Sequence, residues 1–177
     1  MNKATLVLLL LSVSFQTSAI KTEKGSLTVK AVVRNNTCAV AAASQNITIN
    51  MGAEVTKLFY EVGIEARENP FDIILENCGS AAKGVKATLT GNAHPANRSL
   101  FSLNDPQAPS SAKNIGIGVY DAEGKRVEPG KASAAYVLDG ELSNGNGLRF
   151  VARYVSTARP VIAGRAAGSL TFTLTYD

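Results

Sequence analysis

The sequence predicts an all-β sandwich of about seven strands. Its apolar residues fall in short segments rich in β-branched side chains, and most of these segments alternate apolar with polar positions. Turn-forming residues separate them, as at Glu123-Gly124 and Asn144-Gly145-Asn146-Gly147. Sustained helical periodicity is absent apart from one short helical turn expected around 55–60. Many short strands divided by frequent turns are typical of two packed β-sheets.

The expected strands follow one another along a single domain. They cover Leu27–Val33, Ile47–Met51, Phe71–Asn77, Gly84–Thr90, Ile115–Tyr120, Leu148–Tyr154 and Ser169–Tyr176. The proline-containing segment 92–113 predicts long surface connections around the apolar pair Leu100-Phe101. Gly116 and Gly118 have no third glycine and no following helix, so they indicate close packing or a bulge rather than a dinucleotide site.

Residues 1–19 predict a secretory signal peptide. They carry one lysine, then an apolar run from Ala4 to Phe15, and small residues before Ala19. The apolar run is too short to cross roughly 30 Å of hydrocarbon, so we expect no membrane span. The mature chain then starts near Ile20 and suits one exported domain.

Two cysteines, Cys38 and Cys78, are the only ones in the chain. An even pair in an exported protein predicts one disulfide, because the compartment is oxidising. The competing hypothesis, a thiolate metal site, lacks further ligands: His94 is the sole histidine and no C-x-x-C is present. We therefore expect neither a metal nor another cofactor.

Charge and reactive residues argue against nucleic-acid binding and catalysis. The formal net charge is +4, but the basic residues are scattered without a cluster or interleaved aromatics. His94 lies in a loop segment, and we interpret it as solvated. Two S-x-x-K matches, Ser80–Lys83 and Ser110–Lys113, lie in loop-like segments rather than at a helix start, so we interpret them as chance. No catalytic residue is expected.

Taken in order, these segments resemble the pilin subunits of bacterial chaperone-usher fimbriae, most closely the type 1 group. The likeness runs the whole mature length, and its specificity comes from the order and spacing of its parts. Those parts are Asn36–Val40, Ile47–Gly52, Pro70–Cys78, Asn114–Asp121, Leu148–Tyr154 and Leu170–Asp177. The closing segment is the most specific, since such pilins end in alternating apolar residues with a penultimate tyrosine and an upstream glycine. Here these positions are Leu170, Phe172, Leu174, Tyr176 and Gly164.

The resemblance implies an incomplete immunoglobulin-like sandwich that lacks its last strand. A groove is then left open along the core and is bordered by the C-terminal strand. In such pilins a periplasmic chaperone anchors the terminal carboxylate, here that of Asp177, and lays its own strand into the groove. At an outer-membrane usher, the N-terminal extension of the next subunit replaces the chaperone strand.

The same resemblance divides the chain into a signal peptide 1–19, a donor-strand extension 20–33 and a pilin domain 34–177. The extension would present Leu27, Val29, Ala31 and Val33 on one face of a strand. Type 1 relatives usually have glycine where this chain has Ala31, which indicates either a roomier acceptor pocket or altered strand exchange. The alternative for this segment is an ordinary first strand paired within its own domain.

The sequence thus predicts a non-enzymatic structural subunit of a cell-surface fimbrium. Its expected partners are a chaperone, an usher and neighbouring pilin subunits. A different class remains open, namely a self-contained secreted β-sandwich that binds a glycan or a protein through its loops. Such a protein would be stable without a chaperone.

Overall fold

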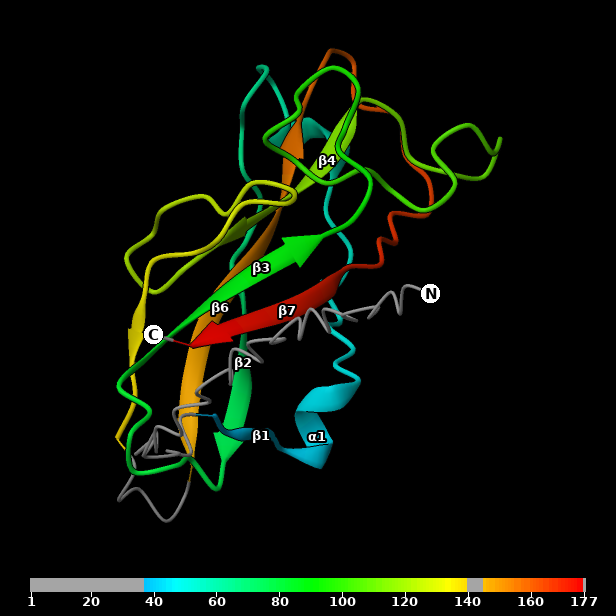
Figure 1. The fold of residues 1–177 in the computed structure, drawn as a ribbon. Helices are drawn as coiled ribbons and strands as arrows, with labels where there is room; N and C mark the ends of the chain where they lie inside the picture. Colours follow the sequence, from blue (N-terminus) through cyan, green and yellow to red (C-terminus); the bar gives the residue numbers. More distant parts are fainter. Residues whose placement is uncertain (1–36, 140–144, 177) are drawn as a thin grey trace, which may run out of the picture. The chain divides into compact units, whose positions relative to one another are not determined.

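The computed structural model describes residues 37–139 and 145–176, which fold almost entirely as β-strands and loops (Figure 1). Two helical segments are short: α1 covers Ala42–Gln45, and a 3-10 helix covers Thr56–Leu58. The strands are β1 (Ala39–Val40), β2 (Asn69–Glu76), β3 (Gly84–Thr90), β4 (Ile115–Tyr120), β5 (Tyr136–Val137), β6 (Asn146–Ser156) and β7 (Thr171–Tyr176).

The strands form two antiparallel sheets. One has the order β1-β2-β6-β4, and β6 is its longest member. The other has the order β5-β3-β7, so the last strand of the chain lies beside β3 (Figure 1). Because neighbours in the sheets are distant in sequence, the fold depends on long-range pairing rather than on local hairpins.

The core takes apolar side chains from both sheets. Ile73 and Leu75 of β2, Leu148 and Phe150 of β6, and Val85 of β3 are all almost completely buried. The alternation in β3 and β6 places every second side chain inward, as a half-buried strand requires. Phe71 stacks against Phe150, with ring centroids 5.6 Å apart.

Strand β4 is buried along its whole length, and a loop pairs with the edge that β6 does not occupy. Leu100 and Phe101, fully buried, lie in that loop, and Phe101 forms a bridge with Ile117. A Cβ added to Gly116 would lie 3.2 Å from the Cβ of Leu100. Close packing of the loop therefore accounts for a glycine in this strand.

Five of the expected strands are found: β3 and β4 have the expected bounds, and β2, β6 and β7 differ by one or two residues at their ends. The expected strand Ile47–Met51 is wrong: these residues are extended but form no ladder within the part of the chain that the structure describes. The physical reason is that no strand in 37–139 or 145–176 pairs with this segment. The expected strand Leu27–Val33 lies outside the described residues.

Three elements were not expected from the sequence. Strands β1 and β5 are two residues long, too short for a periodic pattern. Helix α1 has no side-chain cap, and it is held to β2 because Ser44 Oγ accepts a hydrogen bond from the Ile74 amide at 2.9 Å. Within the described residues, no helix has the length and apolar character needed to cross a membrane.

Candidate functional site

Within the described part of the chain, strand β7 has a strand neighbour on only one of its edges. It pairs with β3, and among the described residues no strand pairs with its other edge. Its inward side chains pair in register as Phe172 with Leu89, Leu174 with Ala87 and Tyr176 with Val85. The three β3 members are buried, whereas the three β7 members are only partly buried. The inner face of β7 therefore lacks cover on its unpaired side.

A second segment faces the same open region. Along 47–51 the side chains of Ile47 and Ile49 are partly buried and Met51 is buried, while Thr48 and Asn50 are exposed. This alternation is that of a strand with one face on a core. Its backbone nevertheless pairs with no described strand, so this segment and β7 share a need for a partner.

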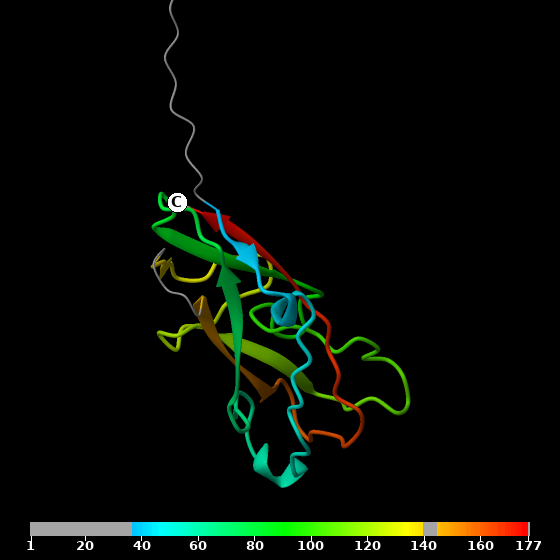
Figure 2. The same ribbon diagram turned by 90° about the horizontal axis from the view of Figure 1, so that it is seen from below.

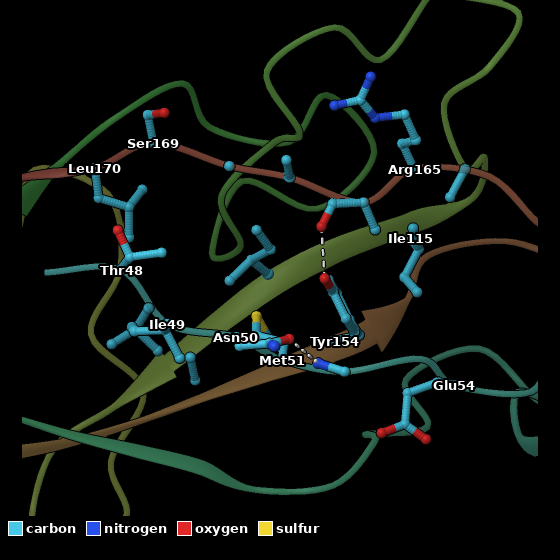
Figure 3. Close-up of a pocket in the computed structure, with 18 of the residues that line it drawn as sticks. Thr48, Ile49, Asn50, Met51, Glu54, Ile115, Tyr154, Arg165, Ser169 and Leu170 are labelled. Carbon is cyan, nitrogen blue, oxygen red and sulfur yellow. Dashed lines mark hydrogen bonds between the residues drawn. The ribbon is translucent and has the colours of Figure 1, made fainter.

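An apolar groove of about 1170 Å³ lies between residues 45–54 and 161–172. Figure 3 shows the two walls, with Thr48, Ile49 and Met51 on one and Arg165, Ser169 and Leu170 on the other. The floor consists of core side chains from both sheets: Phe71, Ile73, Leu89, Ile115, Ile117, Val119, Ala152 and Tyr154. The groove thus opens directly onto the hydrophobic core.

Tyr154 ties the floor to the wall that precedes β7. Its hydroxyl donates a 2.5 Å hydrogen bond to the carbonyl oxygen of Ala166, drawn as a dashed line in Figure 3. Burial, and then the negative charge of Glu54, raise the pKa of Tyr154, so the hydroxyl stays protonated as a donor. This contact fixes the position of a wall segment that has no sheet of its own.

Gly164 allows the same wall to approach a neighbouring loop. The Arg165 amide donates to the Ser110 carbonyl at 2.8 Å, and the Ala112 amide donates to the Arg165 carbonyl at 3.0 Å. A Cβ on Gly164 would lie 2.4 Å from the Ala112 nitrogen, closer than real Cβ atoms approach backbone. A side chain at 164 would therefore push the wall away from residues 110–112.

The predicted disulfide between Cys38 and Cys78 is formed, with an S–S distance of 2.07 Å. It joins the residue before β1 to the turn that follows β2. The Tyr176 hydroxyl donates to the Cys38 carbonyl at 3.3 Å, so the end of β7 lies beside the disulfide. Figure 2 shows β1 and β7 reaching the same end of the fold.

Only some of the predicted site residues lie at the groove. Gly164, Leu170 and Phe172 line the groove. Leu174 and Tyr176 continue the same face of β7 beyond it. The expected donor residues Leu27, Val29, Ala31 and Val33, and the C-terminal Asp177, lie outside the described residues.

The sequence reasoning missed the groove floor and the wall at 45–54. The floor residues carry the same apolar pattern as ordinary core, so no local signal separates them. The wall did carry a signal, the alternation at Ile47–Met51, which was interpreted as an ordinary strand.

The potentially reactive residues noted in the sequence make hydrogen bonds to backbone groups of nearby loops. Lys113 Nζ donates to the carbonyls of Pro106 and Ala108, and Ser111 Oγ donates to the Asp105 carbonyl. Burial lowers the pKa of His94, whose Nδ1 accepts from the Ala96 amide. Within 37–139 and 145–176 no group of three or more potential metal ligands gathers.

Comparison with known families gives a match over residues 26–177 to the family model described as fimbrial protein. Among curated relatives, the probable major fimbrial subunit LpfA of Escherichia coli O157:H7 is 31% identical over 161 residues. That alignment covers 88% of this chain and 86% of the relative.

Solved structures of pilus subunits are also similar to this chain. The P pilus rod subunit PapA is 26% identical with a TM-score of 0.63, and the match covers 79% of this chain and 99% of PapA. A subunit of a chaperone-usher pilus is 22% identical with a TM-score of 0.63, over 91% of this chain and 100% of that subunit, which supports the fold.

Proposed function

This chain belongs to the fimbrial protein family and is a structural fimbrial subunit of the cell surface, and we propose that its groove accepts a strand donated by a neighbouring subunit. The observation that carries this proposal is the open core between β7 and residues 45–54. Both walls have one apolar face toward the core and backbone groups with no ladder partner among the described strands. One inserted strand would cover the apolar faces of both walls and pair with the backbone groups of both.

The energetics favour such an insertion. Each large apolar side chain of a donated strand contributes roughly 1.5 to 3 kcal/mol when it is buried. Each ladder hydrogen bond adds about 0.5 to 1.5 kcal/mol. After the cost of ordering, the strand contributes on the order of 10 kcal/mol, comparable with the total stability of a domain. A subunit with an unfilled groove is therefore barely stable.

The donor in this proposal is the extension 20–33 of another subunit, with Leu27, Val29, Ala31 and Val33 entering the groove. The signal peptide 1–19 is removed, and the pilin domain is 34–177. Insertion next to β7 also covers an edge that would otherwise invite aggregation.

Before assembly, a periplasmic chaperone would fill the groove with its own strand and bind the carboxylate of Asp177. An outer-membrane usher would then be the place where strands are exchanged. The role proposed for the chain is structural and requires no enzymatic chemistry.

Co-expression with and without the cognate chaperone tests the proposal. With the chaperone, we expect a stoichiometric complex of chaperone and subunit in periplasmic extracts. Without it, we expect the subunit to be degraded. Deleting residues 20–31 should leave that complex intact but stop polymerisation. Loss of the chaperone-bound monomer on this deletion would instead mean that the extension is an internal strand.

The alternative, a self-contained ligand-binding sandwich, is not favoured. It would require the groove to be closed by the chain itself. A purified monomer that unfolds cooperatively without any companion, at a temperature typical of complete domains, would support that alternative and contradict the proposal.

A further inference from the structure

Strand β6 separates two ends of the pilin fold. At its start, Asn146 Nδ2 lies 3.5 Å from Cys78 Sγ, and Cys78 is bonded to Cys38. At its last residue, Ser156, the carbonyl accepts from the Gly63 amide at 2.9 Å. Eleven residues at about 3.3 Å each put these ends roughly 33 Å apart. We refer to them as the Cys38 end and the Ser156 end.

Among the described residues, five large apolar side chains are exposed: three lie in one loop at the Ser156 end, Val137 lies at the Cys38 end, and Ile162 lines the groove. Val55, Tyr60 and Val62, which we define as the end patch, flank the 3-10 helix and are exposed by 70%, 59% and 63%. The loop that carries them is hydrogen-bonded to Ser156 through Glu61, Gly63 and Ile64. Figures 1 and 2 both place this loop at the end opposite β1.

Val137, 88% exposed, lies at the Cys38 end. It pairs with Gly84, next to Val85, which pairs with Tyr176. The Tyr176 hydroxyl in turn donates to the Cys38 carbonyl. A single exposed apolar residue such as Val137 is ordinary, whereas the three residues of the end patch together mark an interaction surface.

The direction of strand insertion follows from where the described chain begins. The described residues begin at Thr37, at the Cys38 end. Under the proposed function the extension therefore joins the domain at this end and enters the groove of one neighbour. If the strand that a subunit accepts also left the groove at the Cys38 end, both neighbours would occupy that end. The accepted strand must therefore leave at the Ser156 end. Ile162, which lines the groove, lies near that end, because it is bridged to Lys113, two residues before the Ser156 partner Ile115.

The connection between the two domains is short. Under the proposed function, on which this step rests, only residues 34–36 separate the donor strand from Thr37. The four Cα–Cα steps from Val33 to Thr37 span at most about 14 Å. The folded domain of the donating subunit is thus brought directly against the Ser156 end of the accepting subunit.

We infer that the end patch of one subunit binds the Cys38 end of a second copy of this chain, with Val62 close to Val137 of that copy. The two surfaces differ, so the contact is heterologous and repeats without closing, as a fibre requires. Burial of these apolar side chains would stiffen the joint between consecutive subunits beyond what the inserted strand supplies.

Cysteine cross-linking in assembled fimbriae tests this contact. The full chain carrying both Val62→Cys and Val137→Cys is expressed with its own assembly proteins, and sheared fimbriae are analysed without reductant. We expect a covalent ladder of multimers that collapses on reduction, and no ladder from either single variant. Tyr60→Cys with Val137→Cys is a second pair that tests the same contact.

The matched control is Val62→Cys with Glu123→Cys, because Glu123 is exposed in the turn after β4, away from both ends of β6. Fimbriae that contain the variant but give no more ladder than this control would overturn the inference and leave the proposed function intact. Dimers from Val137→Cys alone would also overturn it, since like ends would then meet. Absence of the wild-type chain from fimbriae would contradict the proposed function as well.

Discussion

Leu89 on β3 and Phe172 on β7 are direct partners in the three-stranded sheet, yet only Leu89 is fully covered. Both line the groove, and both point toward the core. The difference between them arises because β3 at Leu89 has β7 on one side and the loop at 130–132 on the other, where the Gly130 amide donates to the Leu89 carbonyl. Strand β7 has a described strand on one side only. The partial exposure of the Phe172 side chain therefore marks the side of the sandwich where no described strand covers the core.

Replacing Phe172 with arginine should prevent the groove from being filled. A charged side chain on the inner face of β7 would have to be buried beneath the inserted strand, and an unpaired buried charge is strongly unfavourable. We expect at least about a tenfold loss of the chaperone complex, since 1.4 kcal/mol already corresponds to tenfold. The measurement is the amount of complex in periplasmic extracts.

Thr173→Arg is the matched control for Phe172→Arg. Thr173 is the next residue of β7 and is exposed on the opposite face, so the same charge would remain in water. Equal losses from the two variants would mean that the inner face of β7 does not border the inserted strand.

Gly164→Ala should destabilise the groove wall. The added Cβ would clash with backbone atoms of 110–112, which cannot turn aside as a side chain can. Overpacking of this kind costs about 1 to 3 kcal/mol, which corresponds to a fall of several degrees in the Tm of fimbriae. Gly147→Ala is the control, because its Cβ would make only an ordinary contact at 3.5 Å. A Tm unchanged in both variants would contradict the proposed constraint at Gly164.

The strands predicted well from the sequence are those in which an alternating or apolar pattern coincides with a ladder partner in the structure. For Gly84–Thr90 and Ile115–Tyr120 the predicted bounds coincide with β3 and β4, because β-branched and apolar residues are bounded there by turn residues. Ile47–Met51 has the same alternation but no described partner. A sequence pattern reports which face is apolar, whereas a strand also needs a neighbour.

The groove could be predicted only in part for a related reason. Gly164, Leu170 and Phe172 were found because they belong to a segment that resembles the ends of known pilins. The floor residues, such as Ile117 and Tyr154, look like core, and in most domains they would be covered. Their exposure to the groove depends on the three-dimensional absence of a neighbour among the described strands, which no local pattern records.

Removing the disulfide by replacing both Cys38 and Cys78 with serine should lower stability. The bond closes a loop with a sequence separation of 40 residues. The chain-entropy treatment gives a loss of about 4 kcal/mol as an upper expectation. For a domain near the threshold of stability before assembly, we expect the periplasmic yield of the chaperone complex to fall strongly. An undiminished yield, with both cysteines replaced, would show that the bond is dispensable for folding.

A charged cluster should make stability depend on pH. It joins Glu65 and Arg126, from two connecting segments, to Arg153 of β6 beside Tyr120 of β4. Glu65 accepts from Arg126 Nη2 and from Arg153 Nη1, each at 2.9 Å, and also from the Tyr120 hydroxyl. Both guanidinium groups lie over the Tyr120 ring, at 5.2 and 5.1 Å from its centroid. Partial burial alone would raise the pKa of Glu65, but these hydrogen bonds and positive charges outweigh it and lower the pKa.

A lowered folded-state pKa means that Glu65 stabilises the fold above the pKa of an unfolded glutamate, about 4.3, and that this contribution is lost as the pH falls through the folded-state pKa. Glu65→Gln should therefore lower the Tm of fimbriae at pH 7, by about 3 °C for each kcal/mol lost. In acid, below both pKa values, the difference from the wild type should shrink, because the wild-type carboxyl is then neutral too. Glu123→Gln, at an exposed turn, is the control and should change neither the Tm at pH 7 nor the Tm in acid. A Tm difference that stays constant from pH 7 into acid would mean that Glu65 acts through packing rather than through its charge.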